Sequence, residues 1–250
     1  MWARCDPRNT PATNGEYWLV GKVVDAVGND ALFMDIGANK GDWTRKVLSD
    51  AKRRGLSVRV KAFEPSSETR ALLSDEFGEN PSVEIIGTAL SAASGSAEFF
   101  SNRTGSGTNS LHSISGDRRE TVSISTVDEF LGANDIDHVS FAKIDVEGFD
   151  ALVLLGAQRS LAKGTIDLIQ FEYNWRWILN SQSLRNVFQM IENTPYRLGK
   201  LVGDGMLVFD RWHFEMDRFF EGNYVLIRSG GPFESIGTEA RYDASNVLRY

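Results

Sequence analysis

The stretch ALFMDIGANKG, residues 31–41, decides the fold of this chain. Its first half is a short apolar run that ends in the carboxylate of Asp35, and its second half is a turn with glycines at 37 and 41. A run of this length is typical of a strand buried in a parallel sheet. Glycine has no side chain and tolerates unusual dihedrals, so the turn lets the backbone approach a ligand closely. We therefore expect a strand at 31–35 followed by a ligand-binding turn.

The alternation of strand and helix continues along the chain. A helix is predicted from Asp42, whose carboxylate suits a helix N-terminus, and Pro65 introduces the next. Apolar residues at helical spacing indicate further helices at 149–161 and 184–191. Strands are predicted at 58–64, 83–86, 139–145, 166–172, 207–209 and 224–227. This order implies an α/β fold with a doubly wound, mostly parallel sheet and helices on both faces.

Three segments stand apart from this pattern. Valines at helical spacing predict a helix within an N-terminal segment, residues 1–30, ahead of the main domain at 31–228. Inside that domain, residues 101–120 are rich in Ser, Gly and Asn between short strand-like segments, and we interpret them as a long mobile loop. Residues 229–250 are interpreted as a C-terminal tail.

Composition limits the classes of function. The chain has 250 residues with 42% hydrophobic and 24% charged, which is ordinary for a globular protein. Its formal net charge of −7 would repel a polyphosphate backbone, so nucleic acid is not an expected partner. The single cysteine, Cys5, fits a reducing compartment. Neither a signal peptide nor a transmembrane span is recognised in the sequence, and a cytoplasmic protein is expected.

The carboxylates of Asp35, Glu64 and Asp145 each end a predicted strand, where ligands of open parallel sheets bind. The turn after Asp35 reads DxGxxxG and lacks the GxGxxG that a nicotinamide dinucleotide prefers. Glu64 is placed to accept hydrogen bonds from two ribose hydroxyls. With Asp42 just beyond the turn, the pattern favours a nucleoside that carries an ammonium group and no phosphate. S-adenosylmethionine is such a ligand.

Five blocks of the sequence resemble, in order, those of the FkbM-type methyltransferases. The resemblance covers residues 31–172, and KIDVEGFD at 143–150 is its most diagnostic part. It implies a Rossmann-like class I methyltransferase fold and transfer of a methyl group from S-adenosylmethionine to an oxygen, commonly a hydroxyl of a sugar or natural product. The blocks are FMDIGANKG (33–41), KAFEP (61–65), TALS (88–91) with Gly95, STVDEFL (125–131) and KIDVEGFDALVLLGA (143–157).

The same resemblance implies which residues contact the cofactor. The turn after the first strand becomes the methionine-end loop, Glu64 the ribose ligand, and Ala89 with Leu90 part of the adenine wall. Lys40 departs from the family pattern, which usually has an aliphatic residue there. The predicted cofactor-binding residues are Asp35, Gly37, Ala38, Asn39, Gly41, Glu64, Pro65, Ala89, Leu90 and Asp145.

Methyl transfer to oxygen is an in-line displacement, so the enzyme mainly aligns the acceptor and removes its proton. The carboxylates predicted nearest to the methyl group are Asp145, Glu147 and Glu172, and His112 in the loop is an alternative base. An alternative interpretation is that Glu147 caps the following helix. Asp145, Glu172 and Asn174 also lie at strand ends as metal ligands do in the catechol O-methyltransferases. Mg²⁺ or another divalent cation is therefore a further candidate.

The leading hypothesis is an S-adenosylmethionine-dependent O-methyltransferase that methylates a hydroxyl of a sugar, free, in a glycan or in a glycosylated natural product. Tyr173, Trp175 and Trp177 lie on the expected acceptor side, where aromatic faces stack on sugar rings, but such residues are as often core. One alternative is a nucleotide-sugar oxidoreductase, which the missing GxGxxG disfavours. The other is a non-catalytic S-adenosylmethionine-binding protein. The carboxylates at the strand ends disfavour it.

Overall fold

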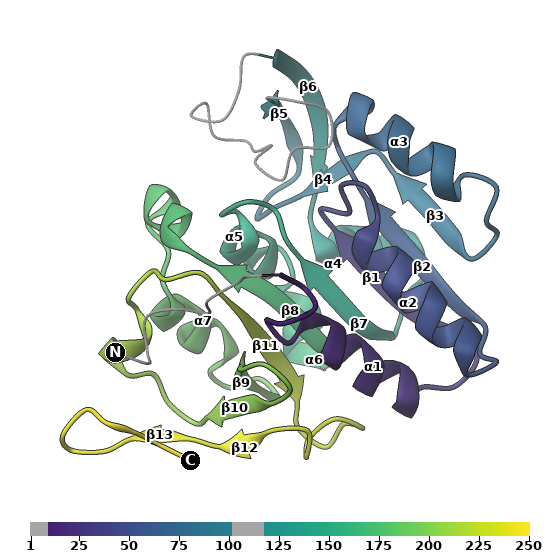
Figure 1. Ribbon diagram of the computed structural model, residues 1–250. Helices are drawn as coiled ribbons and strands as arrows, with labels where there is room; N and C mark the ends of the chain where they lie inside the picture. Colours follow the sequence, from purple (N-terminus) through teal and green to yellow (C-terminus); the bar gives the residue numbers. More distant parts are fainter. Residues whose placement is uncertain (1–9, 102–117) are drawn as a thin grey trace.

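A nine-stranded sheet forms the centre of the protein (Figure 1). The structure is a computed structural model and describes residues 10–101 and 118–250. The strands of this sheet are β1 (Ala31–Ile36), β2 (Val58–Phe63), β3 (Val83–Ile86), β7 (Val139–Ile144), β8 (Ile166–Tyr173), β9 (Tyr196–Leu201), β10 (Met206–Phe209), β11 (Gly222–Arg228) and β12 (Thr238–Glu239). Their order across the sheet is β12-β10-β9-β11-β8-β7-β1-β2-β3.

The half of the sheet that carries the sequence motifs is parallel. β3, β2, β1, β7 and β8 run in one direction, so their carboxyl ends meet at one edge. β11 is antiparallel to both of its neighbours, β8 and β9. A second, three-stranded sheet of β4 (Thr88–Leu90), β5 (Gly95–Ser101) and β6 (Arg118–Ser125) follows β3 and contains the strand-like segments expected around the predicted loop. Residues 102–117 of that loop lie outside the described residues.

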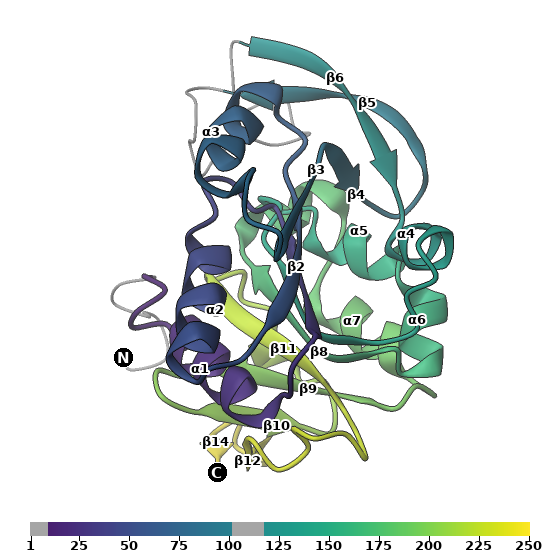
Figure 2. The ribbon, with the colours of Figure 1, turned by 90° about the vertical axis from the view of Figure 1, so that its right-hand side faces the viewer.

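Helices cover both faces of the central sheet, as Figure 2 shows, which confirms the predicted α/β architecture. On one face, Trp43 and the strand residues Phe33 and Phe141 form an aromatic cluster with ring centroids 5.2 to 6.4 Å apart. None of the helices in the described residues is long and apolar enough to cross a membrane. One face carries α1 (Glu16–Ala26) and α2 (Asp42–Arg53), and the other carries α4 (Val127–Ala133), α5 (Asp150–Leu155), α6 (Gln158–Lys163) and α7 (Leu184–Ile191).

The single helix expected over 149–161 is wrong, because the chain forms α5 and α6 with a break between them. At the break the carbonyl of Gly156 accepts the N–H of Asp128 (3.0 Å). The Asp128 carboxylate in turn accepts the backbone N–H groups of Arg159 and Ser160, both at 2.8 Å. A carboxylate that satisfies the first N–H groups of a helix favours a helix start there. The contact with α4 therefore ends one helix and begins the next.

Other elements match their predictions or add to them. α3 (Ser67–Phe77) begins after Ser66, whose hydroxyl accepts the N–H of Thr69 as a helix cap. β9 was not predicted, and the segment interpreted as a tail adds β12 to the central sheet. The remaining elements are the 3₁₀ helices η2 (Trp175–Asn180) and η3 (Phe214–Met216) and the short hairpin of β13 (Arg241–Tyr242) and β14 (Leu248–Arg249).

Candidate active site

A cavity of about 300 Å³ lies at the carboxyl ends of β1, β2 and β7, where an open parallel sheet places its ligand. The turns after these strands form its walls, together with β4 and the chain around the start of α1. Glu147, a predicted catalytic residue, lines it. The predicted cofactor-binding residues that line it are Gly37, Ala38, Asn39, Glu64, Pro65, Ala89, Leu90 and Asp145.

The turn after β1 is held between the two neighbouring strands by backbone hydrogen bonds. The N–H groups of Gly37 and Ala38 donate to the carbonyl of Phe63 (3.0 and 2.9 Å), and the N–H of Asp145 donates to the carbonyl of Ile36 (2.9 Å). Gly37 has a φ of +87°, and a β-carbon there would lie 2.0 Å from the carbonyl oxygen of Asp145. The turn therefore requires glycine at this position.

Glu64 follows β2 and is only 5% exposed. Its Oε2 accepts the N–H of Asn39 (3.0 Å) from the turn after β1, and its Oε1 accepts the N–H of Ser66 (2.9 Å). Burial raises the pKa of Glu64 to about 7, against the lowering effect of these two hydrogen bonds. Each carboxylate oxygen has a further lone pair, so Glu64 can also accept hydrogen bonds from a ligand in the cavity.

Asp35 and Gly41 do not line the cavity and instead support the start of α2. Asp35 is completely buried, its Oδ2 accepts the hydroxyl of Thr44 (2.7 Å), and its Oδ1 has no hydrogen-bond partner among the described residues. Burial raises the pKa of Asp35. Gly41 precedes α2 with a left-handed conformation, close to Phe77. Their predicted contact with the cofactor remains a prediction.

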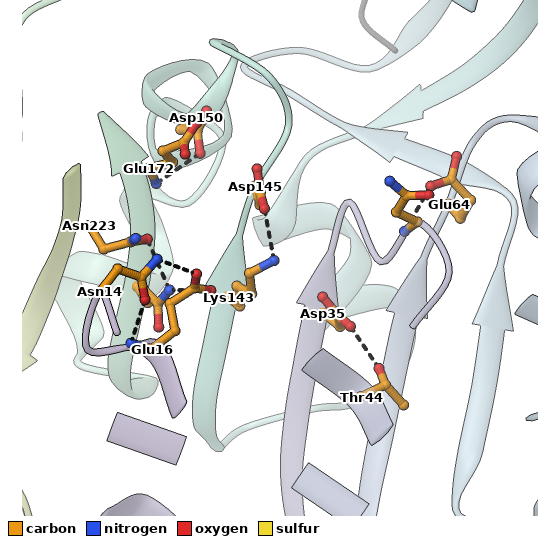
Figure 3. A network of polar contacts seen from close by, with 12 residues as sticks. Asn14, Glu16, Asp35, Thr44, Glu64, Lys143, Asp145, Asp150, Glu172 and Asn223 are labelled. Atoms are coloured by element: carbon orange, nitrogen blue, oxygen red, sulfur yellow. Dashed lines mark hydrogen bonds and ion pairs between the residues drawn. The ribbon is translucent and has the colours of Figure 1, made fainter. Parts of the chain in front are cut away.

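Asp145 follows β7 and is paired with a lysine that sequence reasoning did not single out. The Nζ of Lys143 donates to Oδ2 of Asp145 at 2.9 Å (Figure 3). The Lys143 side chain is 10% exposed, whereas that of Asp145 is 37% exposed. Burial alone would lower the pKa of Lys143, but the carboxylates of Asp145, Glu16 and Asp35 outweigh it and raise that pKa. These carboxylates therefore favour the charged form of Lys143, which lines the cavity.

Three further carboxyl groups lie near Asp145. Glu147 pairs with Arg176 at 3.0 Å, and burial raises the pKa of Glu147 to about 7. Asp150 is completely buried and accepts the backbone N–H of Glu172 (3.2 Å). Burial, followed by the negative charge of Asp145, raises the pKa of both Asp150 and Glu172 well above their usual ranges. Glu172, a predicted base, does not line the cavity.

The predicted metal site finds no support in the structure. Asn174 Nδ2 donates to Glu172 Oε2 (2.6 Å), and its Oδ1 accepts the N–H of Arg176 (2.9 Å) at the start of η2. Asp145 Oδ2 accepts from Lys143. Over residues 10–101 and 118–250, no group of three or more His, Cys, Asp or Glu side chains could hold a metal ion.

The remaining residues predicted near the acceptor differ in where the structure places them. His112, the alternative base, lies outside the described residues. Tyr173 and Trp177 are almost completely buried, and both pack in an aromatic cluster with Tyr224 and Phe171, so they belong to the core. Trp175 is 50% exposed and is therefore accessible.

One wall of the cavity comes from the chain around the start of α1, which belongs to the segment expected to precede the main domain. Pro11, Glu16 and Tyr17 line the cavity from this side. The Glu16 carboxylate is anchored by Asn14 Nδ2 at 2.8 Å (Figure 3). It also accepts from Gln170 Nε2 of the central strand β8 at 3.0 Å. Gln170 is a polar residue inside an apolar run, and such a residue needs a buried partner. The polar Gln170 could therefore be recognised in the sequence, but its partner Glu16 is remote along the chain.

The order of these groups suits a ligand of three linked parts, adenine, ribose and methionine. Ala89 and Leu90 offer an apolar surface beside the strand edge at β3, Glu64 follows β2, and Lys143 lies on β7 beyond β1. Trp43 also lines the cavity, and its buried Nε1–H has no hydrogen-bond partner among the described residues. A buried donor without a partner is costly, so a bound ligand is expected to supply one. The residues therefore fit S-adenosylmethionine.

One relative that is named as a methyltransferase is similar to part of the chain. Hexuronic acid methyltransferase AglP of Haloferax volcanii is 26% identical over 148 residues, which make up 59% of this chain and 58% of that protein. The matched part of the chain thus spans less than two thirds of that relative's length.

Three solved methyltransferase structures are similar to this chain with TM-scores below 0.5. An rRNA methylase from Streptococcus thermophilus has a TM-score of 0.45 at 10% identity, covering 84% of this chain and 94% of that one. Precorrin-6y C5,15-methyltransferase from Geobacter metallireducens has a TM-score of 0.43 at 10% identity, covering 86% and 87%. TrmK of M. capricolum in complex with S-adenosylhomocysteine has a TM-score of 0.44 at 10% identity, covering 90% and 71%.

A model of the methyltransferase FkbM domain matches residues 35–198, well over half of the chain. The matched region contains the turn after β1, Glu64, and the segment from Lys143 to Asp150, and all the cavity-lining residues except Pro11, Glu16 and Tyr17. The fold is accordingly the Rossmann-like fold of class I methyltransferases. The chain belongs to the FkbM methyltransferase family.

Proposed function

We propose that the protein is an S-adenosylmethionine-dependent O-methyltransferase that methylates a hydroxyl of a sugar, free, in a glycan or in a glycosylated natural product. The observation that carries this proposal is the presence of Glu64 and Asp145 in one cavity, on either side of the glycine turn. Family membership supports methyl transfer, and the similarity to a hexuronic acid methyltransferase supports a sugar acceptor.

The cavity residues divide into those that bind the cofactor and those that act on the acceptor. Glu64 accepts hydrogen bonds from the two ribose hydroxyls, and Ala89 with Leu90 packs against the adenine. The backbone of the turn at Gly37 and Ala38 approaches the methionine part closely because position 37 has no side chain. These contacts fix the sulfonium near Asp145.

Asp145 acts as the general base. When bound, S-adenosylmethionine supplies a methyl carbon that the sulfonium activates for displacement. Asp145 is a cavity carboxylate whose side chain is 37% exposed, and Lys143 holds it in place at 2.9 Å. It takes the proton of the acceptor hydroxyl as the oxygen–carbon bond forms and the carbon–sulfur bond breaks. Glu147 is the second candidate base because it lines the same cavity.

Glu64→Ala is expected to fold and to weaken S-adenosylhomocysteine binding at least about tenfold, because it removes hydrogen bonds to a charged group worth about 1.5–3 kcal/mol each. Calorimetric titration measures the dissociation constant, and thermal unfolding checks the fold. Glu79→Ala, which removes an exposed carboxylate, is the matched control. An unchanged dissociation constant in a folded Glu64→Ala variant would remove Glu64 from the site.

The raised pKa of Glu64 also predicts the direction of a pH dependence. The ionised carboxylate is the better acceptor, and the pKa of Glu64 without ligand is about 7. Binding should therefore tighten as the pH rises from about 6 to about 8, when Glu64 loses its proton. Glu64→Gln carries no titrating carboxylate and should flatten this dependence. A slope that persists unchanged in Glu64→Gln would assign it to another group, such as Glu147.

The acceptor is tested with matched pairs of sugars, each with and without a carboxyl group, such as glucosides and glucuronides. Methyl transfer from S-adenosylmethionine is followed by S-adenosylhomocysteine release and by mass spectrometry of the product. A methyl ether that survives alkaline hydrolysis is expected. A methyl group lost in alkali would mean that the acceptor atom is a carboxylate oxygen. Cofactor binding without transfer to any sugar would favour the non-catalytic alternative, and family membership leaves the oxidoreductase alternative without support.

A further inference from the structure

A buried lysine at the base of the cavity has a role still to be assigned. Lys143 lies within β7, where the remaining residues are buried and mostly apolar. Its side chain is 10% exposed, and it lines the cavity. Burying an ammonium group is costly unless it is paired. Asp145 accepts one of its three N–H donors at 2.9 Å, so the same group can also donate to a ligand.

The charges around Lys143 have both signs. Its charge interacts with the carboxylates of Asp145, Glu16 and Asp35. Figure 3 shows the lysine side chain between Glu16 on one side and Asp35 on the other, pointing up to Asp145. A ligand part that carries an ammonium and a carboxylate together would satisfy both signs, whereas a purely anionic or cationic ligand would meet repulsion. An amino acid has these two charges.

The order of the strands places this end of the cavity where the methionine part would lie. β4 follows β3 in the chain, Glu64 follows β2, and Lys143 lies on β7. In the sheet, β1 lies between β2 and β7. A cofactor with its adenine beside β4 and its ribose at Glu64 extends its amino acid towards Lys143. Lys40 also lines the cavity with a positive charge, but it is exposed, and an exposed charge pair contributes little.

We propose that the ammonium group of Lys143 binds the carboxylate of the methionine part of S-adenosylmethionine. The carboxylate of Glu16, which lines the same cavity, then faces the ammonium of the same amino acid. Trp43 is a further donor of the cavity, because it lines the cavity and its buried Nε1–H lacks a hydrogen-bond partner among the described residues. The inference rests on the cofactor of the proposed function, but it does not depend on the acceptor.

The test compares two ligands by calorimetry, S-adenosylhomocysteine and its decarboxylated form, which keeps the ammonium and lacks only the carboxylate. Lys143→Met should weaken S-adenosylhomocysteine binding about tenfold or more, the effect of losing a hydrogen bond between charged groups. The same variant should bind the decarboxylated form within about twofold of the wild type, because that ligand has no group for Lys143 to bind. Lys52→Met, which removes an exposed lysine of α2 that does not line the cavity, is the matched control and should change the affinity for both ligands less than about twofold. Lys40→Met tests the other lysine of the cavity.

Several results would overturn the inference. Equal weakening of both ligands by Lys143→Met would mean a general disturbance of the cavity, and no weakening of either would mean that Lys143 only neutralises Asp145. A selective loss in Lys40→Met would transfer the role to Lys40. If Lys143→Met does not fold, Lys143→Gln, whose amide can still donate to Asp145, gives the same comparison. S-adenosylhomocysteine binding without transfer to any sugar would refute the proposed function and leave this inference open to the same test.

Discussion

Asp145→Asn is expected to fold, to bind S-adenosylhomocysteine within about tenfold of the wild type, and to lose about 10²-fold or more in kcat. That loss is the range for removing a general base. The substitution keeps the shape of the side chain and removes its charge. The side chain is 37% exposed in the cavity, so the neutral amide is not forced into a closed core. In the variant, the carboxylates of Glu16 and Asp35 still compensate the charge of Lys143, which limits the change in the electrostatics of the cavity.

Single-turnover methyl transfer and the pH dependence of kcat distinguish the possible roles of Asp145. Asp75→Asn, an exposed carboxylate on α3, controls for the change of net charge. If Asp145 is the base, the acidic limb of the wild-type profile should disappear in the variant, and EDTA should have no effect on the wild type. If a divalent ion is held there, EDTA should abolish wild-type turnover and Mg²⁺ should restore it. A fully active Asp145→Asn enzyme would contradict both roles and transfer attention to Glu147.

Much of the fold could be predicted because the signals for its strands are local. β1 is a short apolar run, β2 alternates apolar and charged residues along most of its length, and the predicted strand at 83–86 coincides with β3. The errors arise where distant residues decide the structure. The break between α5 and α6 depends on the Asp128 carboxylate, which is contributed by α4. β9 contains a glycine at 199 that packs against Met206, and this contact cannot be recognised in its own sequence.

In the candidate site, too, some residues have a local sequence signal and others depend on distant parts of the chain. Glu64 and the turn after β1 could be predicted from short motifs, because each motif is one strand end and the turn that follows it. Lys143 gave a readable signal, since a lysine inside an apolar strand needs a partner and Asp145, two residues later, shares its face of the strand. Glu16 gave none. It reaches the cavity only because Gln170 holds it there, 154 residues away in the chain.

Gly37→Val is expected to abolish measurable S-adenosylhomocysteine binding and to lower the free energy of unfolding. Gly37 has a φ of +87°, a conformation that costs a non-glycine residue about 1–3 kcal/mol. In addition, its β-carbon would lie 2.0 Å from the carbonyl oxygen of Asp145 and 3.3 Å from the Val146 side chain. That oxygen belongs to the backbone, so β1 and β7 would have to separate. The separation would open the turn that the cofactor needs.

Gly55→Val is the control that separates the two causes of the stability loss, the positive φ and the collision of the new side chain. Gly55 also has a positive φ, +68°, but a β-carbon there meets nothing within 4 Å. It should therefore show the cost of the left-handed backbone without a collision, and its S-adenosylhomocysteine affinity should stay at the wild-type value. Denaturant unfolding gives the two stability losses, and the loss for Gly37→Val should be the larger. Calorimetry at a temperature where both variants remain folded gives the affinities. Wild-type affinity in folded Gly37→Val would mean that the cofactor does not approach this turn, because a valine side chain would then be tolerated at the closest point of the backbone.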